Sequence, residues 1–361
     1  MTTTHYTSSL FRRLLRNKGA AFGLILISLS LLLVLFGYFI APDGSPNANR
    51  MIPEIGSKKP GFEVQLLLIK REQPVQSTSF FSKLIYGSAD QFQYIPIAAN
   101  YKIKGDSLFY DRIVDDYITE PAAMLRNKAA TKPVITTRFY LGTDKFGRDI
   151  LSRLIIGTRV SFAVGIIAVL ISLSIGIMLG ALAGYFRGRT DDIIMWFLNV
   201  IWSIPTLLLV FAITLVLGKG FWQVFVAVGL TMWVNVARLV RGQVLAIREL
   251  EYIEATRVLG YSHLRTIVKH ILPNILGPVM VIAASNFASA IVIEAGLSFL
   301  GVGVQPPQPS WGLMIKENYN FIITNNPMLA LAPGIAIMML VLSFNLLGNG
   351  LRDALEVRGE G

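Results

Sequence analysis

Long apolar runs separated by short polar segments make up most of the chain. The runs cover residues 20–40, 160–186, 193–217, 221–240, 275–300 and 328–347. Each is close to the roughly 20 residues that an α-helix needs to cross a hydrocarbon core ~30 Å thick. The pattern predicts an all-α polytopic membrane protein with six transmembrane helices, the third of which we expect to kink at Pro205.

One large hydrophilic region separates the first run from the others. Its segments GFEVQLLLIK and QFQYIPIAANYKIKGDSLFY are rich in strand-forming residues and partly alternate. Long loops cross a membrane largely regardless of their charge, so its basic residues do not exclude the outer side. We expect a small, partly β extracytoplasmic insert at residues 41–140, between the first span with its N-terminal segment (1–40) and a part with five spans (141–361).

Basic residues gather on one side of the predicted spans. Arg12, Arg13, Arg16 and Lys18 precede the first span. The loops and tail assigned to the same side carry Arg187, Arg189, Arg238, Arg241, Arg248, Arg257, Arg265, Lys269, Arg352 and Arg358. The short loops on the other side offer Lys219 and Lys316. Because lysine and arginine mark cytoplasmic loops, we expect both termini in the cytoplasm, and because the first run is long for a signal peptide, we expect it to be retained.

The composition supports a membrane protein and excludes several kinds of partner and site. Charged residues make up 15% and hydrophobic residues 53% of the 361 residues, whereas a soluble domain has about 25% charged residues. The net charge of +11 does not form one basic stripe interleaved with aromatic residues, which argues against nucleic acid as a partner. It fits both attraction to anionic membrane lipid and cytoplasmic retention of the spans. With no cysteine and only His5, His263 and His270, we expect neither a disulfide nor a metal site.

Motifs of catalytic chemistry are missing from the sequence. There is no GxxxxGK[ST] loop, so the chain should not hydrolyse a nucleotide by itself, and there is no HExxH motif or convincing GxSxG elbow. Glu294 lies inside the fifth run, where a charge is costly, and is therefore a candidate for a substrate pathway. A hydrogen bond to a neighbouring helix is the alternative role. We interpret Asp191 and Asp192 as structural, because carboxylates favour the N-terminus of a helix.

Residues 141–159, LGTDKFGRDILSRLIIGTR, lead into the second span. Thr143 or Asp144 can begin a turn, and Gly147 allows a tight bend. One face of a short helix would be formed by Ile150, Leu151, Leu154 and Ile155. The polar side chains away from this face would be Arg148, Asp149, Arg153 and Arg159. We predict a helix that lies in the membrane interface, and an ordinary lead-in to the span is the alternative.

The polar stretch 251–274 lies between the fourth and fifth runs, on the predicted cytoplasmic side. A first helix is predicted by the one-turn spacing of Tyr252, Ala255, Thr256 and Leu259. Gly260 stands where this helix should end, and Ser262 can cap a second one. The second helix would have an apolar face of Leu264, Ile267, Val268 and Ile271 and would end at Pro273. Two amphipathic helices that meet at a glycine are suited to docking a soluble partner.

This stretch resembles the cytoplasmic loop shared by permease subunits of ABC importers. That loop reads EAA, three residues, G, nine residues and IxLP. Here Thr256 replaces the second alanine and His270 the first isoleucine, which gives HILP, a version common in the peptide-transport branch. The resemblance implies that residues 248–274 form a coupling loop that docks on an ATP-binding subunit. Its site residues would be Glu254, Ala255, Arg257, Leu259, Gly260, Leu264, Leu272 and Pro273.

Three further segments narrow the resemblance. LGTDKFGRDILSR, EAGLSFLGVGVQPPQPSWG and LGNGLRDALEVR are similar to segments of the dipeptide/oligopeptide/nickel permeases, and in particular of their second, C-type subunit. The resemblance covers the first span and residues 141–358. The insert is longer than most such subunits carry.

The resemblance implies a subunit of a heteromeric importer in the bacterial cytoplasmic (inner) membrane. Its partners would be a second homologous permease, two ATP-binding subunits that hold ATP and magnesium, and an extracytoplasmic substrate-binding protein. The chain itself would bind no cofactor and would not be an enzyme. Di- or oligopeptides are the expected cargo, with nickel chelates, glutathione or a peptide antibiotic as alternatives. A membrane enzyme or a secretion-assembly component without an ATPase partner is a more distant alternative.

Overall fold

The computed structural model describes residues 12–72, 78–115, 118–218, 220–323 and 326–356. His5, Lys219 and Arg358, which belong to the histidine and charge patterns above, lie outside these ranges. The chain forms two compact units. The helical unit comprises Met1–Ser30, Ser161–Gln305 and Ile337–Gly361, and the sheet unit comprises Leu31–Val160 and Pro306–Ala336.

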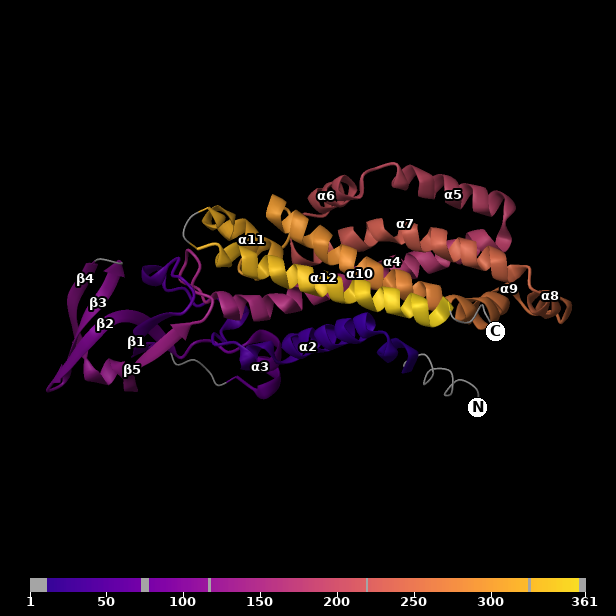
Figure 1. Ribbon diagram of the computed structural model, residues 1–361. Coiled ribbons are helices and arrows are strands. Elements are labelled where there is room, and N and C mark those ends of the chain that lie inside the picture. Colours follow the sequence, from indigo (N-terminus) through magenta and orange to yellow (C-terminus); the bar gives the residue numbers. More distant parts are fainter. Residues whose placement is uncertain (1–11, 73–77, 116–117, 219, 324–325, 357–361) are drawn as a thin grey trace. The chain divides into compact units, whose positions relative to one another are not determined.

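Long apolar helices dominate the described chain. Five of them are long and apolar enough to cross a membrane (Figure 1). They are α2 (Lys18–Ile40), α4 (Ile150–Phe186), α7 (Phe221–Arg248), α10 (Leu272–Leu300) and α12 (Met328–Glu356). The prediction of a mostly helical, multi-span protein with an inserted β region is therefore confirmed.

The third apolar run is divided into two helices. α5 (Gly188–Trp202) and α6 (Thr206–Leu217) are bent by 90° relative to each other, which is far more than the kink expected at Pro205. Pro205 directly precedes the first turn of α6, and it lacks the N–H that would continue the hydrogen bonding of α5. The pair is either one broken span or a re-entrant segment, so the described helices provide five or six spans.

Three glycines spaced one turn apart on α4 pack against α7. A Cβ atom at Gly176 would lie 2.5 Å from the Cβ of Val236, and one at Gly180 would lie 2.4 Å from the carbonyl oxygen of Ala237. Gly184 is similarly close to α7. Side chains do not fit at these distances, so the two helix backbones approach each other closely, as glycine repeats in membrane helices allow.

Replacing Gly180 by alanine should therefore destabilise the helical unit by about 1–3 kcal/mol, the usual cost of overpacking. Gly242→Ala on α7 is the matched control, because a Cβ atom there meets nothing within 4 Å. Alanine in a helix interior is favoured over glycine by roughly 0.5–1 kcal/mol. Thermal unfolding of both variants in the same detergent should show a lower midpoint for Gly180→Ala only, and equal midpoints would contradict the packing role.

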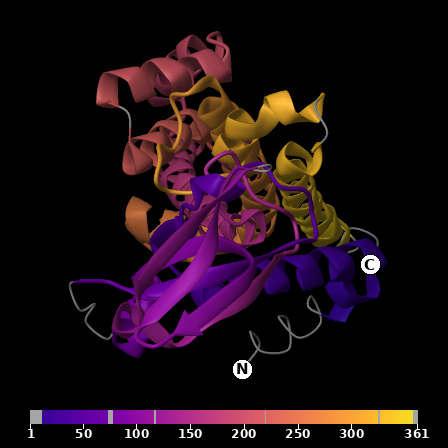
Figure 2. The ribbon, with the colours of Figure 1, turned by 90° about the vertical axis from the view of Figure 1, so that its left-hand side faces the viewer.

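The insert forms one five-stranded antiparallel sheet with strand order β4-β3-β2-β1-β5 (Figure 2). The strands are β1 (Phe62–Lys70), β2 (Phe92–Lys104), β3 (Ser107–Asp115), β4 (Ile118–Leu125) and β5 (Ala129–Phe139). The two segments predicted to be β-rich form β1 to β3. The two edge strands, β4 and β5, were not among the predicted segments. Each contains a proline, Pro121 or Pro133, which is typical of a strand at the edge of a sheet.

Short helices and single turns complete the described chain. The short helices are α3 (Phe80–Tyr86), α8 (Glu251–Val258), α9 (His263–Thr266) and α11 (Trp311–Asn318). Single turns of tighter helix occur at Pro46–Ala48, Pro53–Ile55, Arg126–Lys128 and Tyr319–Ile322. α3 and α11 belong to the sheet unit, and α8 and α9 belong to the helical unit.

The beginning of α4 differs from the predicted interfacial helix. α4 runs without a break from Ile150 to Phe186, so the interfacial prediction is wrong and the lead-in alternative is correct. Arg148 and Arg153, which were placed on a polar face, are each 1% exposed. A buried guanidinium requires charged partners, and one of these comes from a distant part of the chain.

Arg148 is the centre of a buried ion network in the sheet unit. Its Nε donates to Asp144 at 2.6 Å, and its Nη2 donates to Glu317 of α11 at 2.8 Å. Arg153 lies at the edge of the same network, with Nη2 3.5 Å from Glu317 and Nε 3.9 Å from Asp144. The network joins two segments of the chain. One is the turn before α4, and the other is α11, which begins more than a hundred residues after that turn.

One further contact joins α11 to α4, and a capping residue holds the start of α4. The Trp311 indole N–H donates to the carbonyl oxygen of Leu154 at 3.0 Å, and Gly157 leaves room for the ring, since a Cβ atom there would lie 2.9 Å from it. Asp149 caps α4 by accepting hydrogen bonds from the backbone N–H of Ser152, at 2.9 Å, and from its hydroxyl. Burial raises the pKa of the Asp149 carboxyl, while the bonds from Ser152 act in the opposite direction.

Candidate functional site

The polar stretch between α7 and α10 contains the helix end that its glycine predicts. α8 ends at Val258, and Gly260, two residues later, has a φ of +73°, in the left-handed region. The N–H of Gly260 donates to the carbonyl oxygen of Arg257 and the N–H of Tyr261 to that of Thr256, both at 3.0 Å. This pair of bonds is a Schellman motif, which favours glycine at the left-handed position. A Cβ atom at Gly260 would meet nothing within 4 Å, so the glycine is required for its backbone conformation and not for space.

The second helix begins as predicted but does not end as predicted. The Ser262 hydroxyl caps α9 by accepting from the N–H of Arg265 at 3.4 Å. α9 then continues through a wider, π-helical turn at Ile267–Ile271 directly into α10, so the prediction that Pro273 ends this helix is wrong. Pro273 occupies the first turn of α10, and the wider turn before it accommodates the missing N–H.

The inner side of these helices packs on α7 through branched apolar side chains. Ile253 and Ile271 are fully buried, and both belong to one apolar cluster with Val240 and Val244 of α7. Thr256 is buried as well. Its hydroxyl donates to the carbonyl oxygen of Ile253 at 2.7 Å and lies 3.2 Å from the Thr266 hydroxyl of α9. The threonine that departs from the family pattern therefore joins α8 to α9.

The outer side of the same helices exposes large apolar residues. Val258 is 88%, Leu259 69% and Leu264 72% exposed. The predicted apolar faces were therefore only half correct: the exposed members are Tyr252, Ala255, Leu259, Leu264 and Val268, and the buried ones are Thr256, Ile267 and Ile271. Exposed apolar residues gathered on a few turns are typical of a surface that binds another protein.

The other residues of the predicted site are the charged residues of α8 and the first residues of α10. Glu254 and Arg257 of α8 are exposed, and so is Ala255 between them. Leu272 is half-buried and Pro273 is exposed at the start of α10. The outer surface, made of Glu254, Ala255, Arg257, Val258, Leu259 and Leu264, is called the loop surface below. Val258 was not among the predicted site residues, because its position fits neither predicted apolar face.

Hydrogen bonds anchor the loop surface to α4 and α10. The Tyr185 hydroxyl shares a hydrogen bond of 3.0 Å with Nδ1 of His263, and the Asn274 amide donates to the Tyr252 hydroxyl at 3.1 Å. Arg248 donates to the carbonyl oxygen of Tyr185. These contacts hold α9 at the end of α4 and α8 at the start of α10.

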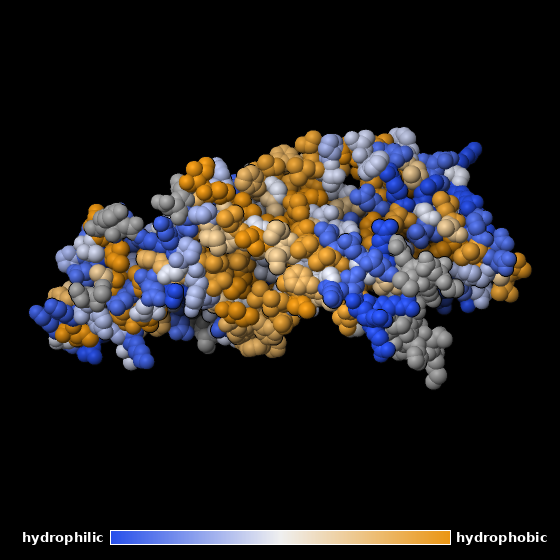
Figure 3. Space-filling view, viewed as in Figure 1, coloured by the Kyte–Doolittle hydropathy of each residue, from blue (hydrophilic) through white to orange (hydrophobic). Residues whose placement is uncertain are grey.

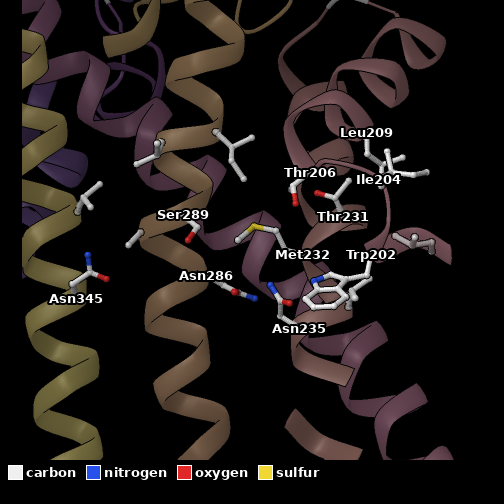
Figure 4. Close-up of a pocket in the computed structure, with 16 residues that line it drawn as sticks. Trp202, Ile204, Thr206, Leu209, Thr231, Met232, Asn235, Asn286, Ser289 and Asn345 are labelled. Carbon is white, nitrogen blue, oxygen red and sulfur yellow. The ribbon is translucent and has the colours of Figure 1, made fainter. Parts of the chain in front are cut away.

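A second feature of the helical unit is a cavity of about 440 Å³ beside the break between α5 and α6 (Figure 4). Residues of α5, α6, α7, α10 and α12 line it. Its polar lining consists of uncharged side chains: Thr206, Thr231, Asn235, Asn286, Ser289 and Asn345. Trp202 and Met232 are among its apolar neighbours. Amides and hydroxyls can donate and accept hydrogen bonds but do not select for charge.

Glu294, the candidate for a substrate pathway, is not among the residues that line this cavity, although Val292 and Ile293 are. Glu294 is fully buried and accepts a hydrogen bond of 2.7 Å from the Ser298 hydroxyl one turn later on α10. Ser298 in turn accepts from the N–H of Val304 at 3.0 Å. These bonds connect Glu294 to the end of α10, and its role in a pathway stays a prediction.

Asp191 forms an ion pair that connects two helices. Its carboxylate accepts from the Nε and Nη2 of Arg241 at 2.5 and 2.6 Å, which joins α5 to α7. Asp191 also lies in the first turn of α5. The ion pair and the position at the start of a helix both fit the structural role predicted for Asp191. The described residues contain no group of histidine, aspartate and glutamate side chains that could hold a metal ion.

Two models of known protein families match the sequence of this chain. Residues 176–358 match the model of the binding-protein-dependent transport system inner membrane component. The chain belongs to this family. Residues 6–53 match a second model, the N-terminal TM domain of oligopeptide transport permease C. The strands of the insert lie between the two matched ranges.

Individual relatives are also transport permeases. The chain is 43% identical over 217 residues to the glutathione transport system permease protein GsiD of Pectobacterium atrosepticum, covering 60% of this chain and 72% of that protein. It is 40% identical over 217 residues to the oligopeptide transport system permease protein OppC of Bacillus subtilis, covering 60% and 71%. It is 40% identical over 241 residues to the di/tripeptide transport system permease protein DppC of Pseudomonas aeruginosa, covering 67% and 77%.

A solved structure of the MetNI methionine ABC transporter aligns with 56% of this chain and 95% of its own chain, at 20% identity and a TM-score of 0.46. The family and the relatives identify the chain as a permease subunit of an ABC transporter, and not as an enzyme. The resemblance read from the coupling-loop residues is thereby confirmed. The roles of the individual site residues stay predictions.

Proposed function

We propose that this chain is the C-type permease subunit of an ATP-driven importer of di- or oligopeptides in a bacterial cytoplasmic membrane. The loop surface carries the proposal: it exposes apolar side chains between two spans of a chain whose sequence has no nucleotide-binding loop. The energy for transport therefore has to enter from another subunit. The names of the relatives support peptides as cargo.

The proposed topology has six spans and both termini in the cytoplasm. The pair α5 and α6 forms the third, broken span, and the coupling loop at residues 248–274 faces the cytoplasm. Residues 1–40, 41–140 and 141–361 are the N-terminal span, the extracytoplasmic insert and the permease domain. The basic residues near the ends of α4, α7 and α8 support this orientation, because positive charge favours the cytoplasmic side.

The proposed complex contains a second homologous permease, two ATP-binding subunits with ATP and magnesium, and an extracytoplasmic substrate-binding protein. Leu259 and Leu264 anchor an ATP-binding subunit, and Glu254 and Arg257 contribute polar contacts around them. Ala255 allows close approach because its side chain is small. Closure of the ATP-binding subunits displaces the loop surface, and the continuous helix through Leu272 and Pro273 passes this motion to α10.

The cavity beside the α5–α6 break is the proposed contact for the cargo. A peptide carries N–H and carbonyl groups along its whole length, and each loses free energy when it leaves water without a hydrogen-bond partner. Six uncharged donors and acceptors line the cavity, so peptides of different side chains can be accepted through their backbones. Glu294 would act on this route only indirectly, through the end of α10.

Asn235→Leu tests the cavity. Asn235 is exposed in the cavity, and loss of one net hydrogen bond of about 1 kcal/mol should lower peptide uptake roughly fivefold. Asn349→Leu on α12 is the matched control, since Asn349 is exposed but does not line the cavity. Uptake of a radiolabelled peptide into vesicles should fall for Asn235→Leu alone. Normal uptake by this variant would remove the cavity from the proposed path.

Glutathione is a second candidate cargo, because one of the relatives is named for glutathione transport. Uptake of labelled peptides and of labelled glutathione by the purified transporter would separate the two. Co-purification of an ATPase with this chain tests the importer function itself. A chain that purifies without any ATPase, under conditions that preserve its fold, would contradict the proposal.

A further inference from the structure

The short helix α3 exposes an apolar surface that the described part of its unit leaves uncovered. Phe81 is 72% and Tyr86 68% exposed, and Phe80 and Ile85 are also more than half exposed. These are four of the seven residues of α3. Large apolar residues gathered in this way mark a surface that binds something apolar. The hydrophobic pattern of the sequence did not reveal it, because the helix is too short to show a period.

α3 is fixed against the last turn of α2. The rings of Phe80 and Phe39 lie 5.3 Å apart, and the Lys83 ammonium lies 4.8 Å from the centre of the Phe39 ring. A guanidinium N–H of Arg159 donates to the carbonyl oxygen of Ile85 at 3.0 Å. All of these residues belong to the sheet unit, so α3 has a defined position at the end of a membrane helix.

The apolar surface of α3 continues the surface of α2. The last turns of α2 expose Leu35, Phe36, Phe39 and Ile40, and only 11% of the apolar part of α2 is buried. Figure 3 shows apolar side chains gathered over both elements. Because α2 is a spanning helix, its exposed apolar side chains face lipid. A surface continuous with them meets the same lipid where α2 leaves the hydrocarbon core.

We propose that α3 is an interfacial membrane anchor of the insert, seated at the boundary between lipid headgroups and acyl chains. Its composition fits this position. Phenylalanine and tyrosine favour the interface, where a ring is half in apolar and half in polar surroundings, and the lysine stem can lie along apolar surface while its ammonium meets phosphate. The anchor holds the insert against the bilayer, and its placement in the outer leaflet rests on the proposed topology.

Depth-dependent fluorescence quenching tests the anchor. The chain has no cysteine, so Phe81→Cys provides a unique site for a bimane label on the full-length protein. The protein is reconstituted in phosphatidylcholine vesicles whose lipids are brominated near the glycerol end of the acyl chain. The label at position 81 should lose roughly twofold in emission compared with vesicles of unbrominated lipid. The same label at Ile85→Cys should be quenched in the same way, which would show that the result at position 81 does not come from a local disturbance there.

Ile103→Cys is the matched control. Ile103 is an exposed apolar residue of β2, and in Figure 1 this strand lies away from the end of α2. Its label should be quenched by aqueous iodide and not by brominated lipid. If the labels on α3 behave like this control, α3 faces water and the anchor is refuted. If they are protected from both quenchers, a protein covers α3 and the anchor is also refuted. The readout does not depend on transport, so a failure of the proposed function would leave this result intact.

Discussion

Gly260→Val should strongly impair transport while leaving the chain folded and inserted. Gly260 holds a φ of +73° at the end of α8, and a left-handed conformation costs an L-residue roughly 1–2 kcal/mol, more for a β-branched one. Such a cost shifts a local equilibrium by roughly 5–30-fold. The new side chain meets no clash, because a Cβ atom there has nothing within 4 Å. The strain is therefore relieved by a change in the backbone between α8 and α9.

The expected result follows from the proposed coupling role. With the angle between α8 and α9 altered, Leu259 and Leu264 no longer present one surface to the ATP-binding subunit. Peptide uptake should fall at least roughly tenfold, in line with the shift expected from the strain. ATP hydrolysis should continue but lose its dependence on the loaded binding protein. Both are measured in proteoliposomes with the assembled transporter.

Gly260→Asn is the matched control. Asparagine adopts the left-handed conformation more readily than other side-chain residues, so this variant should keep most of its uptake. Wild-type uptake by Gly260→Val would contradict the coupling role of the backbone at this position. Equal impairment of the valine and asparagine variants would show that side-chain volume, and not conformation, is the cause.

Arg148→Met should destabilise the protein more than any other substitution considered for this chain. It removes the cation that Asp144 and Glu317 share, and breaking a buried ion pair in this way costs about 3–5 kcal/mol. Methionine keeps an unbranched apolar stem in place of the arginine stem, so the substitution mainly removes the guanidinium and its ion pairs. The midpoint of thermal unfolding in detergent should fall by about 10 °C.

Two further variants make this prediction specific. In the double variant Arg148→Met, Glu317→Leu, one charge of each sign is lost, and Asp144 remains with Arg153. The double variant should therefore be more stable than Arg148→Met alone, as a double-mutant cycle would record. Arg138→Ala is the control for an exposed pair, because Arg138 and Glu63 are more than half exposed, and the midpoint should change little. Equal effects at Arg148 and Arg138 would contradict the buried network.

The predictions that succeeded depend on short-range physics. The spanning helices follow from the length of apolar runs, and the helix end at Gly260 follows from the conformational freedom of one residue. β1 to β3 follow from strand-forming residues in a local alternation. None of these conclusions required knowledge of a residue distant in the sequence.

The predictions that failed concern partners distant along the chain. The sequence places Arg148 and Arg153 on a polar face, but both are buried and share Glu317, which lies 169 and 164 residues away, as a partner together with the nearby Asp144. The apolar faces of α8 and α9 contain both buried and exposed residues because α7 covers one side only. The helix that was expected to end at Pro273 continues into α10, because the wider turn before Pro273 accommodates the proline. Turns of that kind have no local signature in the sequence.

The sequence by itself determined that this protein has several spans, carries a β-rich insert and places a loop of two short helices between two of the spans. These properties depend on run lengths, on alternation and on a glycine. Only the tertiary structure decided which side of the loop is exposed, that Thr256 joins its two helices and that α3 continues the lipid-facing surface of α2. Exposure is a property of what neighbouring segments cover, and in this chain the covering segments come from other helices and from residues far away in the sequence.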